Sequence, residues 1–123
     1  MNSLLLYVAA FLALITMLIH SIVGEKRLIS PLVNSNDGIM AQNLAKQVLR
    51  FAWHFMTLLG LIAVYVLFDA ARSFPAVDRV LLLLTGTVFL VAGVYDAIVT
   101  RGKHIGWPFL AGIGVLTLIA LYI

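Results

Sequence analysis

Long apolar runs separated by short polar stretches make up most of the chain. Four such runs cover residues 4–23, 49–68, 80–99 and 107–123. About 20 apolar residues in a helix cross the ~30 Å hydrocarbon layer of a bilayer, and the fourth run lies near the lower limit of that length. Lipid cannot pair backbone polar groups, and no alternating strand pattern occurs, so the pattern predicts helices rather than a barrel.

The expected fold is an all-α membrane protein with four antiparallel transmembrane helices in a small bundle. Short connections favour antiparallel neighbours, and residues 1–123 are expected to form one domain. The one long connection contains the turn signal Ser30-Pro31. From about residue 37 to 48, apolar residues recur with a helical period. We expect an amphipathic helical extension there, lying on the membrane surface or running into the second span.

Two further proline signals are interpreted as helix starts. Ser73 with Pro75 precedes the third apolar run, and Gly106 with Pro108 precedes the fourth. Proline is tolerated in the first turn of a helix because its missing N–H would be unpaired there anyway. The sequence therefore predicts that the third and fourth helices begin at these two positions.

Composition supports the membrane as the solvent of the chain. Hydrophobic residues make up 63% and charged residues 11%, whereas a soluble domain carries about a quarter charged residues. The mean hydropathy is +1.12. The net charge of +3 arises from residues in loops beside the spans, so the expected partner is the lipid bilayer and nucleic acid is not expected. Cysteine is absent, which excludes thiolate chemistry.

The basic residues predict the orientation. One side of the expected bundle carries Lys26, Arg27, Lys46, Arg50, Arg101 and Lys103, and the other carries Arg72 and Arg79. The side richer in Lys and Arg usually faces the cytoplasm. Both termini are then expected on the non-cytoplasmic side.

Three segments resemble parts of small four-span bacterial membrane proteins. They read LIHSIVGEKRLISPL, LRFAWHF and GKHIGWPFLAGIGVL. The resemblance implies a location in the bacterial inner (cytoplasmic) membrane. It brings no function or site residue with it.

Small residues at helical spacing predict the packing faces. Ala9, Ala13 and Thr16 lead to His20 on the first span, and Gly86 and Gly93 lie on the third. Such residues let membrane helices approach closely. The face with the two glycines is expected to serve either a seam within the chain or a contact in a homo-oligomer or larger membrane complex.

Polar side chains gather in the cytoplasmic half of the predicted bundle. The candidate ligand- or metal-binding residues are His20, Glu25, His54, Asp96 and His104, supported by Thr16, Arg50, Trp53 and Thr57. Ionisable groups within membrane spans are costly, so they usually face partners inside a bundle. We expect a polar mouth formed by His20, Arg50, His54, Asp96 and His104.

Several interpretations of the polar mouth compete. His20 and His54 form either hydrogen bonds between helices or a pair of axial ligands for haem b. With His104, Glu25 or Asp96 they would instead bind a transition metal such as zinc, copper or non-haem iron. Arg50, His54, Trp53 and Thr57 together suggest a pocket for a quinone or a lipid head group. Asp96 is expected to form an ion pair with a nearby cation.

Enzyme chemistry has little support in the sequence. Ser21 adjoins His20, but successive residues point about 100° apart on a helix, so the two do not face each other. Paired carboxylates and a glycine-rich phosphate loop are absent. The expected function is that of a small integral membrane binding or accessory protein with the polar mouth as its site. The first alternative is electron transfer through haem or a metal, and a further one is a membrane enzyme of unknown chemistry.

Overall fold

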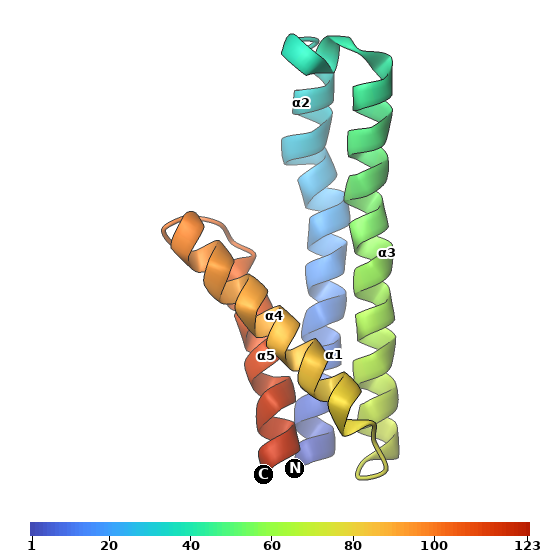
Figure 1. Cartoon of the computed structure of the whole chain (residues 1–123), viewed down its shortest axis with the longest axis vertical. Coiled ribbons are helices and arrows are strands. Elements are labelled where there is room, and N and C mark those ends of the chain that lie inside the picture. The colour runs from blue at the N-terminus through green and yellow to red at the C-terminus, as the bar shows by residue number, and fades with distance from the viewer.

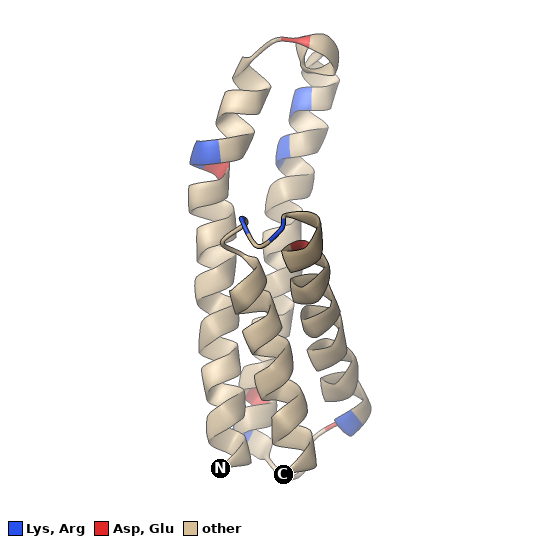
Figure 2. Cartoon of the chain, turned by 90° about the vertical axis from the view of Figure 1, so that its left-hand side faces the viewer, with Lys and Arg blue, Asp and Glu red and all other residues tan.

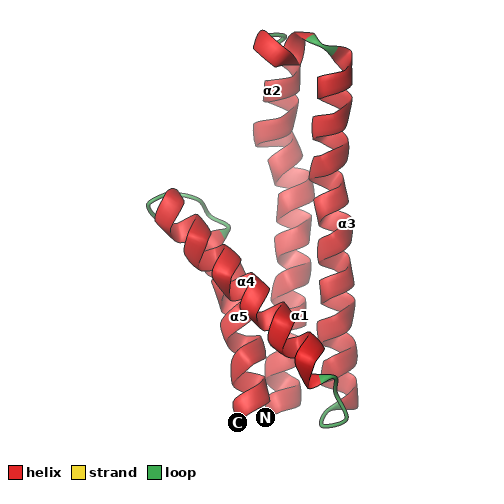
Figure 3. Cartoon of the chain, viewed as in Figure 1, coloured by secondary structure: helices red, strands yellow, loops and turns green.

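The computed structural model describes all of residues 1–123 and contains helices and loops but no strand (Figure 3). The α-helices are α1 (Asn2–Leu18), α2 (Ser30–Asn34), α3 (Asn43–Ser73), α4 (Arg79–Val99) and α5 (Trp107–Tyr122). Two π-helical turns, Ile19–Val23 and Glu25–Ile29, join α1 to α2 into one helix from Asn2 to Asn34. The prediction of an all-helical chain is confirmed.

Three helices are long and apolar enough to cross a membrane: Asn2–Asn34, α3 and α4. At ~1.5 Å per residue, the 31 residues of α3 extend about 46 Å and the 21 residues of α4 about 32 Å. The 16 residues of α5 extend only about 24 Å. The hairpin made by α1, α2 and α3 is therefore longer than the ~30 Å apolar layer and projects beyond the α4–α5 hairpin (Figure 1).

The turn expected at Ser30-Pro31 is wrong, because the helix continues to Asn34. Proline in a regular α-helix lacks the N–H of one backbone bond, and its ring clashes with the carbonyl four residues earlier. The turn just before Pro31, Glu25–Ile29, is π-helical. In a π-helical turn an N–H bonds to the carbonyl five residues earlier, as the Ser30 N–H does to the Glu25 carbonyl. The helix accommodates the proline directly after this wider turn.

The chain reverses direction between Asn34 and Asn43. Asn36 and Gly38 adopt positive φ angles of 57° and 54°, and a 3₁₀ turn follows at Gly38–Ala41. The regular helix α3 then begins at Asn43 and runs without a break into the second apolar run. The expected helical extension thus exists from Asn43 onward, whereas its first residues form the 3₁₀ turn.

Of the two helix starts predicted from proline signals, one is wrong and one is confirmed. The start expected at Ser73 with Pro75 is wrong: α3 continues to Ser73, and α4 begins at Arg79. Asp78 caps α4, since its Oδ1 accepts a hydrogen bond of 2.9 Å from the Leu81 N–H. The start expected at Gly106 with Pro108 is confirmed, because Gly106 is the N-cap of α5.

The helices form two hairpins that diverge from a common end. α1 packs against both α3 and α5, and α4 packs against α5, whereas α3 and α4 contact each other little. Figure 1 shows α4 crossing away from α3, with both termini at the end where the hairpins meet. The core lies at this end and unites Leu6 and Ala9 of α1, Leu67 of α3, and Ile113 and Ala120 of α5.

Small residues lie where these helices approach most closely. Ala9 and Ala13 of α1 are fully buried. A Cβ added at Gly86 would lie 2.9 Å from Leu118 Cγ, and one at Gly93 would overlap the Ala111 backbone. The glycine face of α4 is therefore the seam with α5 inside the chain, and a homo-oligomer would have to use another face.

We predict that Gly93→Ala destabilises the protein, because the new methyl group meets backbone that cannot move aside. Overpacking of this kind costs about 1–3 kcal/mol. Thermal unfolding in detergent measures the effect. Gly112→Ala is the matched control, since its Cβ would contact only Leu12 Cδ2 at 3.2 Å. Equal melting temperatures for the two variants would contradict the close α4–α5 contact.

Candidate functional site

One carboxylate joins the two arms of the long hairpin. Glu25, on the continuous first helix, accepts a hydrogen bond of 2.8 Å from Ser30 Oγ at its Oε1. The same oxygen lies 2.9 Å from Arg50 Nη2, and Oε2 lies 3.3 Å from His54 Nε2. Arg50 and His54 are four residues apart and so share one face of α3, which places both beside the same acid.

The second ring nitrogen of His54 returns to the first helix. His54 Nδ1 lies 3.0 Å from Ser21 Oγ, and Ser21 is four residues before Glu25. A pair spaced by four on one helix thus meets a pair spaced by four on its antiparallel neighbour. We call Ser21, Glu25, Ser30, Arg50 and His54 the Glu25 cluster.

Sequence reasoning missed the role of Ser21 because it considered only the adjacent His20. The signal that could have found it is the matched spacing of Ser21 with Glu25 and of Arg50 with His54 on two helices expected to be antiparallel. Ser30 was interpreted as a turn residue, although it lies on the same helix one turn beyond Glu25.

Ser21, His54 and Glu25 follow one another in the order of a nucleophile, a base and an acid. Acyl transfer also needs donors aimed at the developing oxyanion. Ser21 lies inside a continuous helix, where backbone N–H groups are bonded within the helix itself. The arrangement therefore links and orients side chains but lacks an oxyanion hole beside Ser21.

His20 and Trp53 form a second link, deeper in the apolar part of the hairpin. Their rings stack with centroids 4.0 Å apart and an interplanar angle of 12°. Trp53 Nε1 donates to the His20 carbonyl at 3.0 Å, and His20 Nε2 lies 3.2 Å from the Trp53 carbonyl, which requires a proton on that nitrogen. Gly24 makes room for the indole, because a Cβ there would lie 2.5 Å from Trp53 Cζ2.

The link between His20 and Trp53 changes the hydrogen bonding of the Thr57 hydroxyl. Four other threonines donate to the carbonyl four residues earlier, namely Thr16, Thr85, Thr100 and Thr117. The corresponding carbonyl for Thr57 is that of Trp53, which already pairs with His20. The Thr57 hydroxyl oxygen is buried and has no hydrogen-bond partner, so His20 takes the carbonyl that a helical threonine normally uses.

Asp96 and His104 form a separate pair at the open end of the α4–α5 hairpin. His104 Nδ1 lies 2.5 Å from Asp96 Oδ2, and Thr100 Oγ1 accepts a hydrogen bond of 3.3 Å from the His104 N–H. Neither Asp96 nor His104 forms an ion pair or hydrogen bond with Glu25 or His54. The residues expected in one polar mouth are thus divided between the two hairpins.

The separation of these residues between two hairpins limits the number of ligands that haem iron or a metal ion could find in one place. The structure brings together no group of three or more His, Cys, Asp or Glu side chains that could hold a metal ion. His54 Nδ1 is engaged with Ser21, His54 Nε2 lies 3.3 Å from Glu25 Oε2 without a hydrogen bond, and His20 Nε2 faces a carbonyl. His20 Nε2 is therefore not free to share an iron with His54, and Glu25 with His54 alone provides fewer ligands than a typical zinc site.

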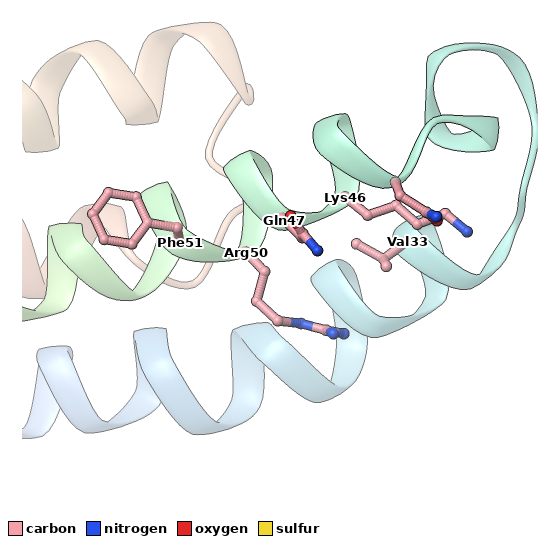
Figure 4. A pocket seen from close by; sticks show the side chains of 6 residues that line it. Val33, Lys46, Gln47, Arg50 and Phe51 are labelled. Atoms are coloured by element: carbon pink, nitrogen blue, oxygen red, sulfur yellow. The ribbon is translucent and has the colours of Figure 1, made fainter.

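A pocket of about 360 Å³ adjoins the Glu25 cluster toward the tip of the hairpin (Figure 4). It lies between α2 and the first turns of α3. Its lining consists of Val33, Asn43, Lys46, Gln47, Arg50 and Phe51. Arg50 belongs to both the pocket and the cluster, so the two form one continuous polar region.

Comparisons with known proteins add no assignment. No protein-family model matches the chain, and neither a curated protein nor a solved structure is similar to it.

We predict that Glu25→Gln lowers the melting temperature in detergent, because it removes the charge that pairs with Arg50. Asp69→Asn is the matched control: Asp69 pairs with Arg72 at 3.3 Å on the surface of α3, where the Arg72 side chain is 72% exposed. If both single variants melt alike, Glu25 does not hold the hairpin together.

Proposed function

We propose that the chain is a non-enzymatic integral membrane protein that binds a small ligand at the Glu25 cluster and its adjoining pocket. The observation that carries the proposal is the meeting of a carboxylate, a guanidinium and an imidazole between two long helices that are each apolar enough to span a membrane. These groups lie beside a pocket that contains a second cation, Lys46. Binding rather than reaction is favoured because the serine of the cluster lacks an oxyanion hole.

Stability alone is a weak reason for such a cluster. An ion pair as exposed as that of Glu25 with Arg50 contributes little to stability. The Arg50 side chain is 44% exposed and retains donors beyond its bonds to Glu25 and Ser30. These features support a ligand role for the side of Arg50 that faces the pocket.

In this proposal the three long helices and the shorter α5 all cross the membrane. α5 is short, but it packs between α1 and α4, and its Ile113, Thr117 and Ala120 are fully buried. A helix enclosed by two spans and joined to one of them by a short loop belongs at the same depth. A short span is accommodated by local thinning of the bilayer.

The proposed orientation places both termini outside and the projecting tip of the long hairpin on the cytoplasmic side of a bacterial inner membrane. Lysine and arginine are concentrated on the projecting hairpin and on the 100–106 loop (Figure 2). This excess supports a cytoplasmic side for the Glu25 cluster.

The ligand proposal predicts a non-covalent mass on the purified protein. Native mass spectrometry of protein extracted in mild detergent should show it on the wild type and not on Glu25→Gln/Arg50→Gln, which removes both charges together. Asp96→Asn is the control and should retain the mass, because Asp96 pairs with His104 on the other hairpin.

Elemental analysis of the same sample separates the alternatives. About one iron, copper or zinc per chain would support haem or metal binding and overturn the present proposal. Wild-type protein without any added mass would also contradict it.

The topology can be tested by cysteine labelling, because the chain has no cysteine of its own. We predict that Ala76→Cys, in the loop between α3 and α4, reacts with a membrane-impermeant maleimide on intact cells. Ser35→Cys, at the tip of the long hairpin, should react only after the cells are opened. The reverse pattern would show that the protein is inserted the other way round.

A further inference from the structure

The pocket beside the Glu25 cluster has a cationic end. Lys46 donates to the neutral amide oxygen of Asn36 and forms no ion pair, so its charge is not neutralised. Arg50 borders the same pocket, and the Asn43 and Gln47 amides add neutral donors. Two cations and two amides around one cavity are the chemistry of a site for a phosphate group.

The start of α3 adds to the positive field. Asn43 is the first residue of this 31-residue helix and lines the pocket. The first turn of α3 contains no acidic residue, and no side chain caps it. Its free N–H groups and the helix dipole therefore favour an anion beside them.

The two apolar residues of the lining lie apart: Val33 is beside Lys46, and Phe51 is at the other end of the pocket (Figure 4). Phe51 lies at the end nearer the body of the protein, and Lys46 lies nearer the hairpin turn (Figure 4). The Phe51 side chain is 68% exposed, although it is large and hydrophobic. A free phosphate ion would gain nothing from Phe51, whereas a lipid would place its glycerol and the start of its acyl chains there.

The depth of the pocket agrees with a lipid. Arg50 is the second residue of the expected second span, and Lys46 lies one helical turn, about 6 Å, farther out. The polar head-group layer on each side of a bilayer is of the same order of thickness. With the second span starting at residue 49 as expected, the cations would lie at the level of lipid phosphates and Phe51 at the cytoplasmic edge of the hydrocarbon.

We propose that this pocket binds the phosphate of an anionic phospholipid, with Lys46 and Arg50 on the phosphate and Phe51 beside its glycerol and acyl chains. The inference rests on the proposed ligand-binding function and identifies its ligand class. Because Arg50 also pairs with Glu25, a bound head group would be linked to the contact that joins the two arms of the hairpin.

Lipid titration of the delipidated full-length protein tests the proposal. The probes are dihexanoyl phosphatidylglycerol, dihexanoyl phosphatidylcholine and inorganic phosphate, with binding measured by native mass spectrometry. Phosphatidylglycerol should bind at one site per chain and more tightly than phosphatidylcholine. Inorganic phosphate should bind too weakly to be detected at the same concentration. Binding of inorganic phosphate as tight as that of phosphatidylglycerol would overturn the lipid assignment in favour of a free anion.

Variants of the two neighbouring lysines locate the site. Lys46→Gln should weaken phosphatidylglycerol binding about tenfold, the expected effect of losing one charge-assisted hydrogen bond, and Lys46→Arg should restore most of it. Lys26→Gln is the matched control, because it removes the same charge from the same hairpin but lies outside the pocket. Equal losses for Lys46→Gln and Lys26→Gln would show non-specific attraction and overturn the proposed site.

The two proposals fail in different ways. Purified wild-type protein that carries a ligand other than a phospholipid would overturn the lipid assignment and leave the binding function intact. Wild-type protein that carries no ligand and takes up none of the three probes would overturn both.

Discussion

The interaction on which the long hairpin depends is the contact of Glu25 with Arg50, His54 and Ser30. At the end with the termini, α1 is held between α3 and α5 by an apolar core. Past the α4–α5 hairpin that core is absent, and only Ile29 and Val33 are buried on the first helix. A carboxylate with partners on both arms supplies one directional link there, beside the His20–Trp53 link, and it also fixes Arg50 beside the pocket.

The elements of the fold could be predicted from the sequence because apolar runs of span length have few alternatives. The helix starts could not be predicted from prolines alone, because the effect of a proline depends on the backbone around it. Pro31 continues a helix after a π-helical turn, and Asp78 rather than Ser73 precedes α4. Both outcomes depend on backbone geometry that residue types alone do not specify.

The candidate site was predicted in part. The sequence placed His20, Glu25, Arg50 and His54 in one half of the bundle but could not assign their partners. Those partners depend on helix rotation: it turns His54 toward Ser21 and Glu25, and it turns His20 onto Trp53. It also leaves Asp96 with His104 on the other hairpin. The result is an ion-paired cluster beside a cationic pocket, which favours an anionic amphiphile over a metal centre as ligand.

The most direct test of this account is the distance between the two arms. Spin labels on Leu32→Cys and Leu44→Cys, both exposed positions, report it by pulsed electron paramagnetic resonance in nanodiscs. The account predicts one narrow distance distribution for the wild-type background and a broad one when Glu25→Gln is added. An equally narrow distribution in the Glu25→Gln background would contradict the claim that this carboxylate holds the hairpin and its pocket in place.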